Sequence, residues 1–209
     1  MRSKHRKDEG LRFGPVGADA VHLCVDMQRL FADETPWRTP WMERVLPNVV
    51  ALSQCNPERT IFTRFIPAVR PGEGQGVWQR YWRRWADVTF ERLGAEMVEL
   101  VPALAKLTPP ARLIDKPSLY SPWLTPELEA ALGQLNAETL IISGGETDVC
   151  VLATVLGAVD RGYRTIVVTD ALCSSSDETH DALMTLYAQR YGQQVETVKT
   201  SEMLAEWKS

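Results

Sequence analysis

One cysteine lies in a segment whose sequence suits a reactive thiol. Cys150 ends the run SGGETDVC, residues 143–150. Its two glycines permit a tight turn with unusual backbone angles, and the apolar residues that follow predict a helix. Free N–H groups and the dipole at a helix start favour a thiolate and can bind an oxyanion. The segment therefore predicts a nucleophile, although Val149, Val151 and Leu152 also suit a cysteine buried in an apolar helix.

Two ionisable residues follow other apolar segments. Asp26 comes directly after VHLCV, and Lys116 lies at the end of the segment that begins at Arg112. An aspartate at this place is also typical of a turn, and a lysine without further context is most often a surface residue. Both side chains are candidates for a site only if the fold brings the two segment ends close to Cys150.

Short apolar segments alternate with helical patterns along the chain, and this alternation predicts such a fold. The predicted strands are Val21–Met27, Thr60–Phe65, Arg112–Lys116, Thr139–Ser143, Thr165–Thr169 and Val195–Thr200, and the predicted helices are Met42–Leu52, Pro126–Leu135, Val149–Arg161 and Ser176–Tyr191. Several strands are apolar on both faces, which is typical of a parallel sheet covered by helices on both sides. Ligands of such α/β sheets bind beyond the carboxyl ends of the strands, where the strand order reverses.

Length and composition indicate one globular domain. The chain has 209 residues and a net charge of −4, so a basic surface for nucleic acid is not expected. Residues 1–12 are predicted to form a charged, mobile arm, residues 13–209 a single domain, and residues 67–94 an excursion from the sheet. No apolar run approaches the roughly 20 residues of a membrane span. The charged N-terminus lacks the apolar stretch of a signal peptide, which predicts a cytoplasmic location.

Three segments together resemble the isochorismatase-like cysteine hydrolases, a superfamily that includes nicotinamidases and N-carbamoylsarcosine amidohydrolases. They are VDMQ at residues 25–28, the lysine at 116, and GGETDVCVLAT at residues 144–154. The resemblance extends from about Ala20 to the end of the chain. It implies a three-layer α/β/α Rossmann-like fold whose six-stranded parallel sheet has the order 3-2-1-4-5-6.

The resemblance also implies a catalytic set. Asp26, Lys116 and Cys150 would form the triad, and the N–H groups of Glu146 and Cys150 would bind the oxyanion. The Gly145–Glu146 peptide bond would be cis. Lys116 and the helix start would lower the pKa of the thiol, and Asp26 would take its proton before attack on a carbonyl carbon.

The expected reaction is hydrolysis of a C–N bond in a small amide, ureide or carbamoyl compound. Nicotinamidases of the superfamily carry a metal-binding Asp-x-His segment after strand two, where this chain reads TRFI at residues 63–66. Neither a metal nor a cofactor is therefore expected. None of the three histidines serves the scheme: His5 lies in the arm, His22 is predicted to be a core residue and His180 a surface residue. Isochorismatases proper lack the nucleophilic cysteine.

Five residues are candidates for substrate binding: Gln28, Arg64, Trp82, Tyr120 and Trp123. Arg64 could bind a substrate carboxylate through two hydrogen bonds, and it could equally form a structural salt bridge. The tryptophans could line the pocket, pack in the core or form a subunit interface. By the resemblance, a homodimer or homotetramer is expected.

Other hypotheses remain at this point. Cys173 also precedes a predicted helix and is a rival nucleophile, although its segment lacks the two glycines. The chain could instead hydrolyse another small molecule in the manner of an isochorismatase, be a silent binding protein with a reactive thiol, or respond to redox conditions.

Overall fold

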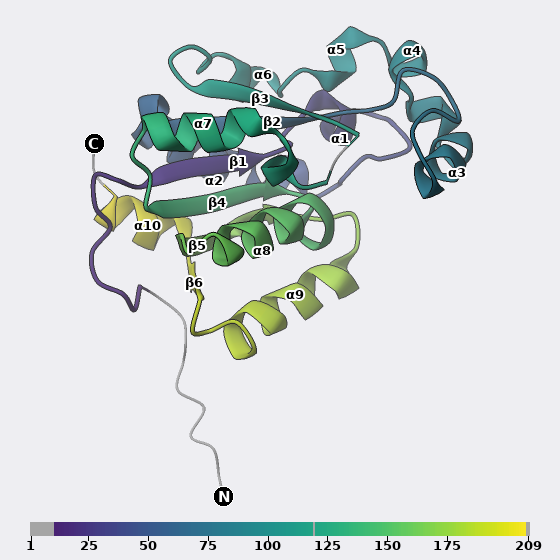
Figure 1. The fold of residues 1–209 in the computed structure, drawn as a ribbon. Helices are drawn as coiled ribbons and strands as arrows, with labels where there is room; N and C mark the ends of the chain where they lie inside the picture. The colour runs from purple at the N-terminus through teal and green to yellow at the C-terminus, as the bar shows by residue number, and fades with distance from the viewer. Residues whose placement is uncertain (1–10, 119, 208–209) are drawn as a thin grey trace, which may run out of the picture.

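Six parallel strands form one sheet in the computed structural model, which describes residues 11–118 and 120–207 (Figure 1). The strands are β1 Val21–Val25, β2 Thr60–Ile66, β3 Arg112–Pro117, β4 Thr139–Gly145, β5 Arg164–Cys173 and β6 Val195–Val198. Their order across the sheet is β3-β2-β1-β4-β5-β6, which confirms the predicted fold class and topology.

Helices cover both faces of this sheet. The α-helices of the described residues are α1 Arg29–Ala32, α2 Met42–Cys55, α3 Val77–Arg84, α4 Phe90–Leu93, α5 Ala95–Val98, α6 Pro102–Ala105, α7 Pro126–Gln134, α8 Leu152–Asp160, α9 Asp177–Gln189 and α10 Thr200–Glu206. Short 3₁₀ turns occupy Pro57–Arg59, Ala86–Val88 and Pro122–Leu124, and a π-helical turn occupies Thr147–Val151. Figure 1 shows α7, α8 and α9 on one face and α2 and α10 on the other.

Two apolar cores result, one on each side of the sheet. Side chains alternate between the faces of a strand, so Leu23 packs under α7 and α8 whereas Cys24 packs under α2. All five residues of β1 are buried, as expected for the central strand of a covered parallel sheet.

The strand order reverses between β1 and β4, and there two strand ends meet. Val25 is paired with Gly144. Gly144 has φ +109°, and a Cβ atom at this position would lie 2.1 Å from the Val25 carbonyl oxygen, so only glycine fits. This close approach brings the segment after β1 beside the segment after β4.

Several element boundaries differ from the predicted ones. β1 ends at Val25, two residues early, because Asp26 has φ +49° and leaves the strand direction. The predicted helix Val149–Arg161 begins instead with the π-helical turn at Thr147.

The last two residues of the predicted arm, Leu11 and Arg12, contact the rest of the described chain. Leu11 packs against one of the cores, and the Arg12 guanidinium donates hydrogen bonds to the carbonyl groups of Gly192 and Val195. Both residues therefore belong to the folded domain, and the rest of the predicted arm lies outside the described residues.

The excursion at residues 67–94 carries α3 and α4 past the carboxyl edge of the sheet (Figure 1). Trp78, Trp82 and Trp85 project from α3 and its end, and Trp82 and Trp85 contact Trp37 of the segment after α1. This aromatic cluster forms a cover over the strand ends. No helix in the described parts of the chain is long and apolar enough to cross a membrane.

His22 predicts how stability depends on pH. It is buried in β1, its Nε2 lies 2.7 Å from Ser143 Oγ, and burial lowers its pKa to about 3. Between pH 6.5 and 3 the unfolded chain binds a proton at His22 that the folded chain does not. The contribution of His22 to the unfolding free energy therefore falls with falling pH by about 1.4 kcal/mol per pH unit.

We expect His22→Gln to remove this contribution. Urea unfolding at pH 7.0 and 4.5 gives the loss of unfolding free energy for each protein, and this loss is expected to be about 2–3 kcal/mol smaller in the variant. Because each protein is compared with itself, the cost of the substitution at pH 7.0 cancels. Equal losses of unfolding free energy in both proteins would contradict the lowered pKa of His22.

Candidate active site

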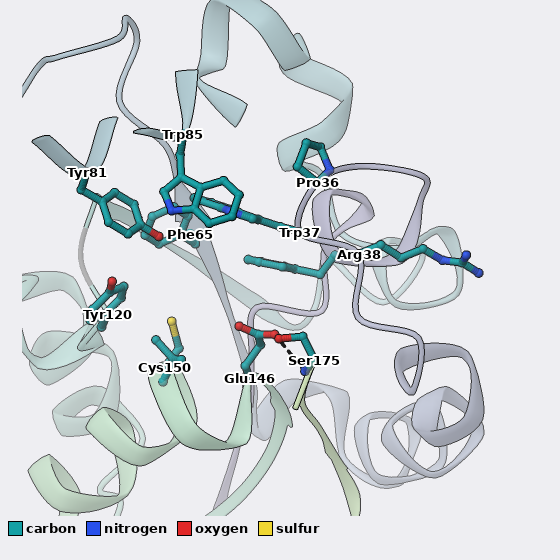
Figure 2. A pocket seen from close by; sticks show the side chains of 12 residues that line it. Pro36, Trp37, Arg38, Phe65, Tyr81, Trp85, Tyr120, Glu146, Cys150 and Ser175 are labelled. Carbon is teal, nitrogen blue, oxygen red and sulfur yellow. Dashed lines mark hydrogen bonds between the residues drawn. The ribbon is translucent and has the colours of Figure 1, made fainter. Parts of the chain in front are cut away.

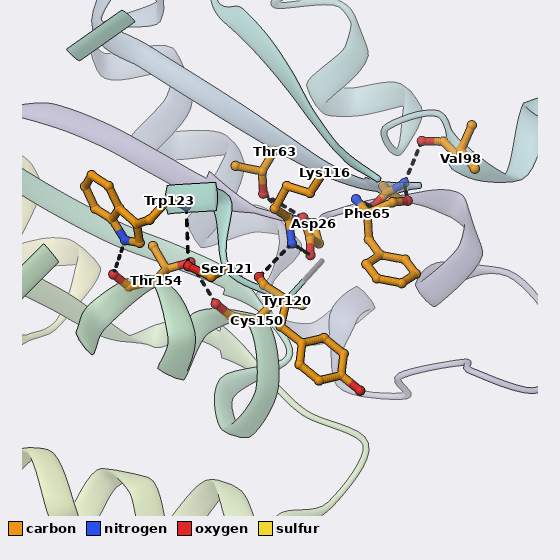
Figure 3. Close-up of polar contacts among 11 residues, drawn as sticks. Asp26, Thr63, Phe65, Val98, Lys116, Tyr120, Ser121, Trp123, Cys150 and Thr154 are labelled. Atoms are coloured by element: carbon orange, nitrogen blue, oxygen red, sulfur yellow. Dashed lines mark hydrogen bonds and ion pairs between the residues drawn. The ribbon is translucent and has the colours of Figure 1, made fainter. Parts of the chain in front are cut away.

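Asp26, Lys116 and Cys150 come together from three different segments (Figure 3). Asp26 follows β1, Lys116 lies in β3, and Cys150 lies in the π-helical turn after β4. Lys116 Nζ is 2.6 Å from Asp26 Oδ2, and both side chains are buried. The Cys150 thiol interacts with both of them. The three residues singled out in the sequence therefore form one cluster at the switch point of the sheet.

Thr63 of β2 fixes the orientation of Asp26. Its hydroxyl donates a 2.6 Å hydrogen bond to Asp26 Oδ1, and the Asp26 backbone N–H donates to the Thr63 carbonyl at 3.2 Å. One carboxylate oxygen thus accepts from Thr63 and the other from Lys116. Sequence reasoning did not single out Thr63, which lies between Phe62 and the charged Arg64 of β2.

The Lys116 ammonium is charged despite its burial. Burial alone lowers the pKa of Lys116, but its interactions with Asp26 and Cys150 outweigh this effect and the pKa is raised. The ammonium also donates a 3.0 Å hydrogen bond to the Tyr120 carbonyl. The pair with Asp26 is therefore a buried ion pair supported by further hydrogen bonds, which is the form in which buried charges persist.

Cys150 differs in one respect from the expectation. Burial raises the pKa of its thiol, the Asp26 carboxylate raises it further, and the Lys116 ammonium opposes both without reversing the direction. The lowered pKa expected from the sequence is therefore wrong for this structure. Burial and the adjoining Asp26 carboxylate therefore favour the neutral form of the Cys150 thiol.

The backbone before Cys150 offers a donor to the site. The Gly145–Glu146 peptide bond, for which the resemblance implies the cis form, is cis. Among the described residues, no acceptor pairs with the Glu146 N–H. The helix start that follows supplies further N–H groups. This arrangement can hold a developing oxyanion.

A cavity of about 260 Å³ opens above Cys150 (Figure 2). It is lined by Phe31, Pro36, Trp37, Arg38, Phe65, Tyr81, Trp85, Tyr120, Glu146, Val149, Cys150 and Ser175. Figure 2 shows the Cys150 sulfur pointing into it from below and Trp85 and Tyr81 facing it from the opposite side. The cavity therefore has the Cys150 sulfur at its floor and aromatic rings over it.

Tyr120 is the predicted substrate-binding residue whose side chain lines this cavity. Gln28 does not, because its amide is occupied with backbone groups. It donates to the Phe65 and Val98 carbonyl groups and accepts from the Phe65 N–H. Trp82 belongs to the aromatic cluster over the strand ends, but it has no exposed surface and does not line the cavity. For these two residues a structural role replaces the expected contact with substrate.

Arg64 and Trp123 also lie away from the cavity. Arg64 forms ion pairs with Asp115 and Glu99, which is the structural alternative considered for it. Trp123 packs in the core under α7 and α8, and its indole N–H donates to the Thr154 carbonyl. Four of the five residues expected to contact substrate therefore lie outside the cavity lining, which contains other aromatic residues.

Cys173, the rival nucleophile, has no exposed surface and does not line the cavity. Its thiol faces the Gly144 carbonyl at 3.9 Å. Burial raises its pKa as well, and the pair of charged partners found at Cys150 does not contribute to it. The structure therefore favours Cys150 as the reactive thiol.

His180 is buried, not on the surface as predicted. Its Nδ1 lies 2.9 Å from Thr147 Oγ1, and its ring packs on Trp41. It therefore supports the turn that carries Cys150. Within residues 11–118 and 120–207, no group of three or more His, Cys, Asp or Glu side chains is arranged to hold a metal ion.

Comparison with known proteins places this site in context. The model of the isochorismatase domain matches residues 20–199. Nicotinamidase 3 of Arabidopsis thaliana is 24% identical over 184 residues, which cover 87% of each chain. An uncharacterised isochorismatase family protein of Bacillus subtilis is 33% identical over 76 residues. That match spans 36% of this chain and 42% of the relative, less than half of the relative's length.

The fold has counterparts among solved structures. The crystal structure of a cysteine hydrolase from Pseudomonas syringae pv. phaseolicola superimposes with a TM-score of 0.79 and 21% sequence identity. The match covers 95% of this chain and 97% of that one. At this identity the likeness shows the fold alone.

Proposed function

This chain belongs to the isochorismatase family of hydrolases, and within that family we propose that it cleaves the C–N bond of a small amide, ureide or carbamoyl compound. Cys150 is the proposed nucleophile, and the reaction passes through a thioester. Asp26 is the proposed acid and base, and Lys116 forms a buried ion pair with it. The carrying observation is the buried Asp26–Lys116 pair in contact with a thiol that faces a cavity.

The first half of the proposed reaction forms the thioester. Asp26 takes the Cys150 proton as the sulfur attacks the substrate carbonyl carbon, so a free thiolate need not accumulate. The carbonyl oxygen becomes an oxyanion held by the N–H groups of Glu146 and Cys150. Asp26 returns its proton to the leaving nitrogen, the C–N bond breaks, and ammonia or an amine departs.

The second half regenerates the thiol. The Asp26 carboxylate takes a proton from water, and the oxygen of that water attacks the thioester carbon. The C–S bond breaks, the acid product leaves, and Cys150 recovers the proton from Asp26. Lys116 remains charged throughout and offsets the negative charge that moves between oxygen and sulfur.

Trapping the intermediate tests this proposal. A panel of small carboxamides, ureides and carbamoyl compounds is screened for ammonia release, and the best substrate is mixed with enzyme and quenched in acid within one turnover. We expect mass spectrometry to find the Cys150 peptide heavier by the acyl group of the substrate. Turnover without an adduct, with no hydroxamate formed when hydroxylamine is added, would contradict the thioester route.

A further inference from the structure

We propose that the cavity selects amide substrates that carry a positively charged nitrogen, bound between the Glu146 carboxylate and the aromatic cover. This inference rests on the proposed amidohydrolase function and adds the substrate class. It also replaces the expectation that Arg64 binds a substrate carboxylate, because Arg64 is paired with Asp115 and Glu99 outside the cavity.

The Glu146 carboxylate shares the cavity floor with Cys150. One oxygen, Oε1, accepts from the Ser175 N–H at 3.0 Å and from the Thr39 hydroxyl at 3.3 Å. In Figure 2 one carboxylate oxygen turns toward Ser175 and the other toward the space above Cys150. A carboxylate held in this way has a fixed position and keeps acceptor capacity for a ligand.

The charges around the cavity leave this carboxylate uncompensated. Lys116 and Asp26 neutralise each other behind Cys150. Arg38 lines the cavity with its stem, but its guanidinium pairs with Glu34 and points away from Cys150 in Figure 2. No ion pair within the described residues includes Glu146. A carboxylate beside apolar walls gains most from a cation, and it repels a substrate carboxylate.

The aromatic lining of the cavity also suits a cation. Phe31, Phe65, Trp37, Tyr81 and Trp85 supply aromatic rings to the lining. Ring faces attract ammonium and other organic cations within about 6 Å, and indole does so best. Aromatic walls above and a carboxylate below therefore favour the same charge from two sides.

The positions of Glu146 and Cys150 limit the length of the substrate. Glu146 directly precedes the turn that carries Cys150, and the two side chains point to the same side in Figure 2. A carbonyl carbon on the sulfur and a cation beside the carboxylate must therefore lie within one small molecule, in keeping with a cavity of about 260 Å³. A short aminoalkyl amide fits this description.

Binding without turnover tests the charge preference. The Cys150→Ala variant is titrated by calorimetry with 4-aminobutanamide, neutral pentanamide and anionic glutaramic acid, three amides of similar length. We expect the cationic amide to bind at least about tenfold tighter than the neutral one and the anionic amide to bind weakest. Adding Glu146→Gln, which keeps the shape and the acceptor oxygen, is expected to reduce the preference below about threefold.

Kinetics gives the same test in the active enzyme. The ratio of kcat/KM for 4-aminobutanamide to that for pentanamide is measured in the wild-type chain, in Glu146→Gln and in Glu96→Gln. We expect a high ratio in the wild type, lost in Glu146→Gln mainly through KM. Glu96 is an exposed carboxylate of α5 outside the cavity lining, so its variant removes the same charge and is expected to keep the ratio.

The outcomes separate this inference from the proposed function. Hydrolysis of both amides with no preference, or a preference retained in Glu146→Gln, overturns the cationic subsite and leaves the amidohydrolase intact. A binding preference for the cation with no hydrolysis of any amide supports the subsite and overturns the amidohydrolase. The comparison of ligands in the wild-type chain needs no variant, so it holds even if Glu146→Gln fails to fold.

Discussion

Replacing Cys150 with alanine is expected to lower kcat/KM for the best amide substrate by about 10⁴-fold or more, whereas Cys173→Ala retains activity within about threefold. Among the cysteines that the structure describes, Cys150 lines the cavity and interacts with Asp26 and Lys116. Without its sulfur no thioester can form, and only the weak catalysis of binding and oxyanion stabilisation remains. Cys173 supplies only packing in this scheme.

Cys173→Ala is the matched control because it removes the same atom from a cysteine one strand away. Cys173 is fully buried beside Gly144 and Gly145, so its loss is expected to lower stability by about 1 kcal/mol while the site keeps its geometry. Ammonia release and thermal unfolding are measured for both variants. Full turnover by Cys150→Ala, or loss of turnover only in Cys173→Ala, would contradict the assignment of Cys150 as the nucleophile.

The backbone positions of the site could be predicted from sequence because they depend on local patterns. Apolar segments of strand length end at Asp26 and near Lys116, and two glycines precede the turn to Cys150. In a parallel sheet the carboxyl ends of neighbouring strands meet at one edge. The close contact of Gly144 with Val25 is the physical reason that the glycine pattern carried this information.

The lining of the cavity could not be predicted in the same way. Trp82 and Trp85 lie three residues apart, yet Trp82 is in the core and Trp85 faces the cavity. Their directions depend on how the excursion at residues 67–94 crosses the strand ends. That path is fixed by contacts with Trp37, which is distant in sequence, so residue type and spacing alone do not separate the two.

The direction of the Cys150 pKa was missed for a related reason. Lys116 and the helix start lower a thiol pKa, and both are visible in the sequence as local features. Desolvation acts in the opposite direction and depends on how completely the cover closes over the site. Burial raises the pKa of Cys150 more than Lys116 lowers it, and the proposed mechanism therefore gives Asp26 the role of proton acceptor at the moment of attack.

The proposed role of Asp26 predicts that two substitutions beside Cys150 will have the same effect on hydrolysis and opposite effects on the alkylation of Cys150. Asp26→Asn removes the proposed proton acceptor, and Lys116→Met removes the positive charge that is paired with Asp26. Each substitution is therefore expected to lower kcat/KM by about 10³-fold. Asp26→Asn also removes a negative charge that raises the pKa of Cys150. The Cys150 thiolate fraction at pH 7 should then rise, and iodoacetamide should react about tenfold faster or more.

Lys116→Met is the matched control for this effect. It removes a positive charge that lowers the pKa of Cys150, so alkylation at pH 7 is expected to be slower than in the wild type. Rates are measured by intact mass, and peptide mapping assigns the label to Cys150. Equal alkylation rates in the two variants would contradict the electrostatic account, and retained hydrolysis in Asp26→Asn would contradict the acid–base role.

The activities of the Asp26 and Lys116 variants can be compared only if each variant remains folded. Removing one partner of the buried Asp26–Lys116 pair leaves an uncompensated charge, which costs about 3–5 kcal/mol, whereas removing both charges costs far less. The double variant Asp26→Asn/Lys116→Met is therefore expected to unfold at higher urea concentration than either single variant and still to lack hydrolysis. Its alkylation rate should lie between those of the single variants, because the two charge effects on the Cys150 pKa then cancel. If the double variant recovered activity together with stability, the pair would be structural only, and the proton acceptor for Cys150 would have to be another group.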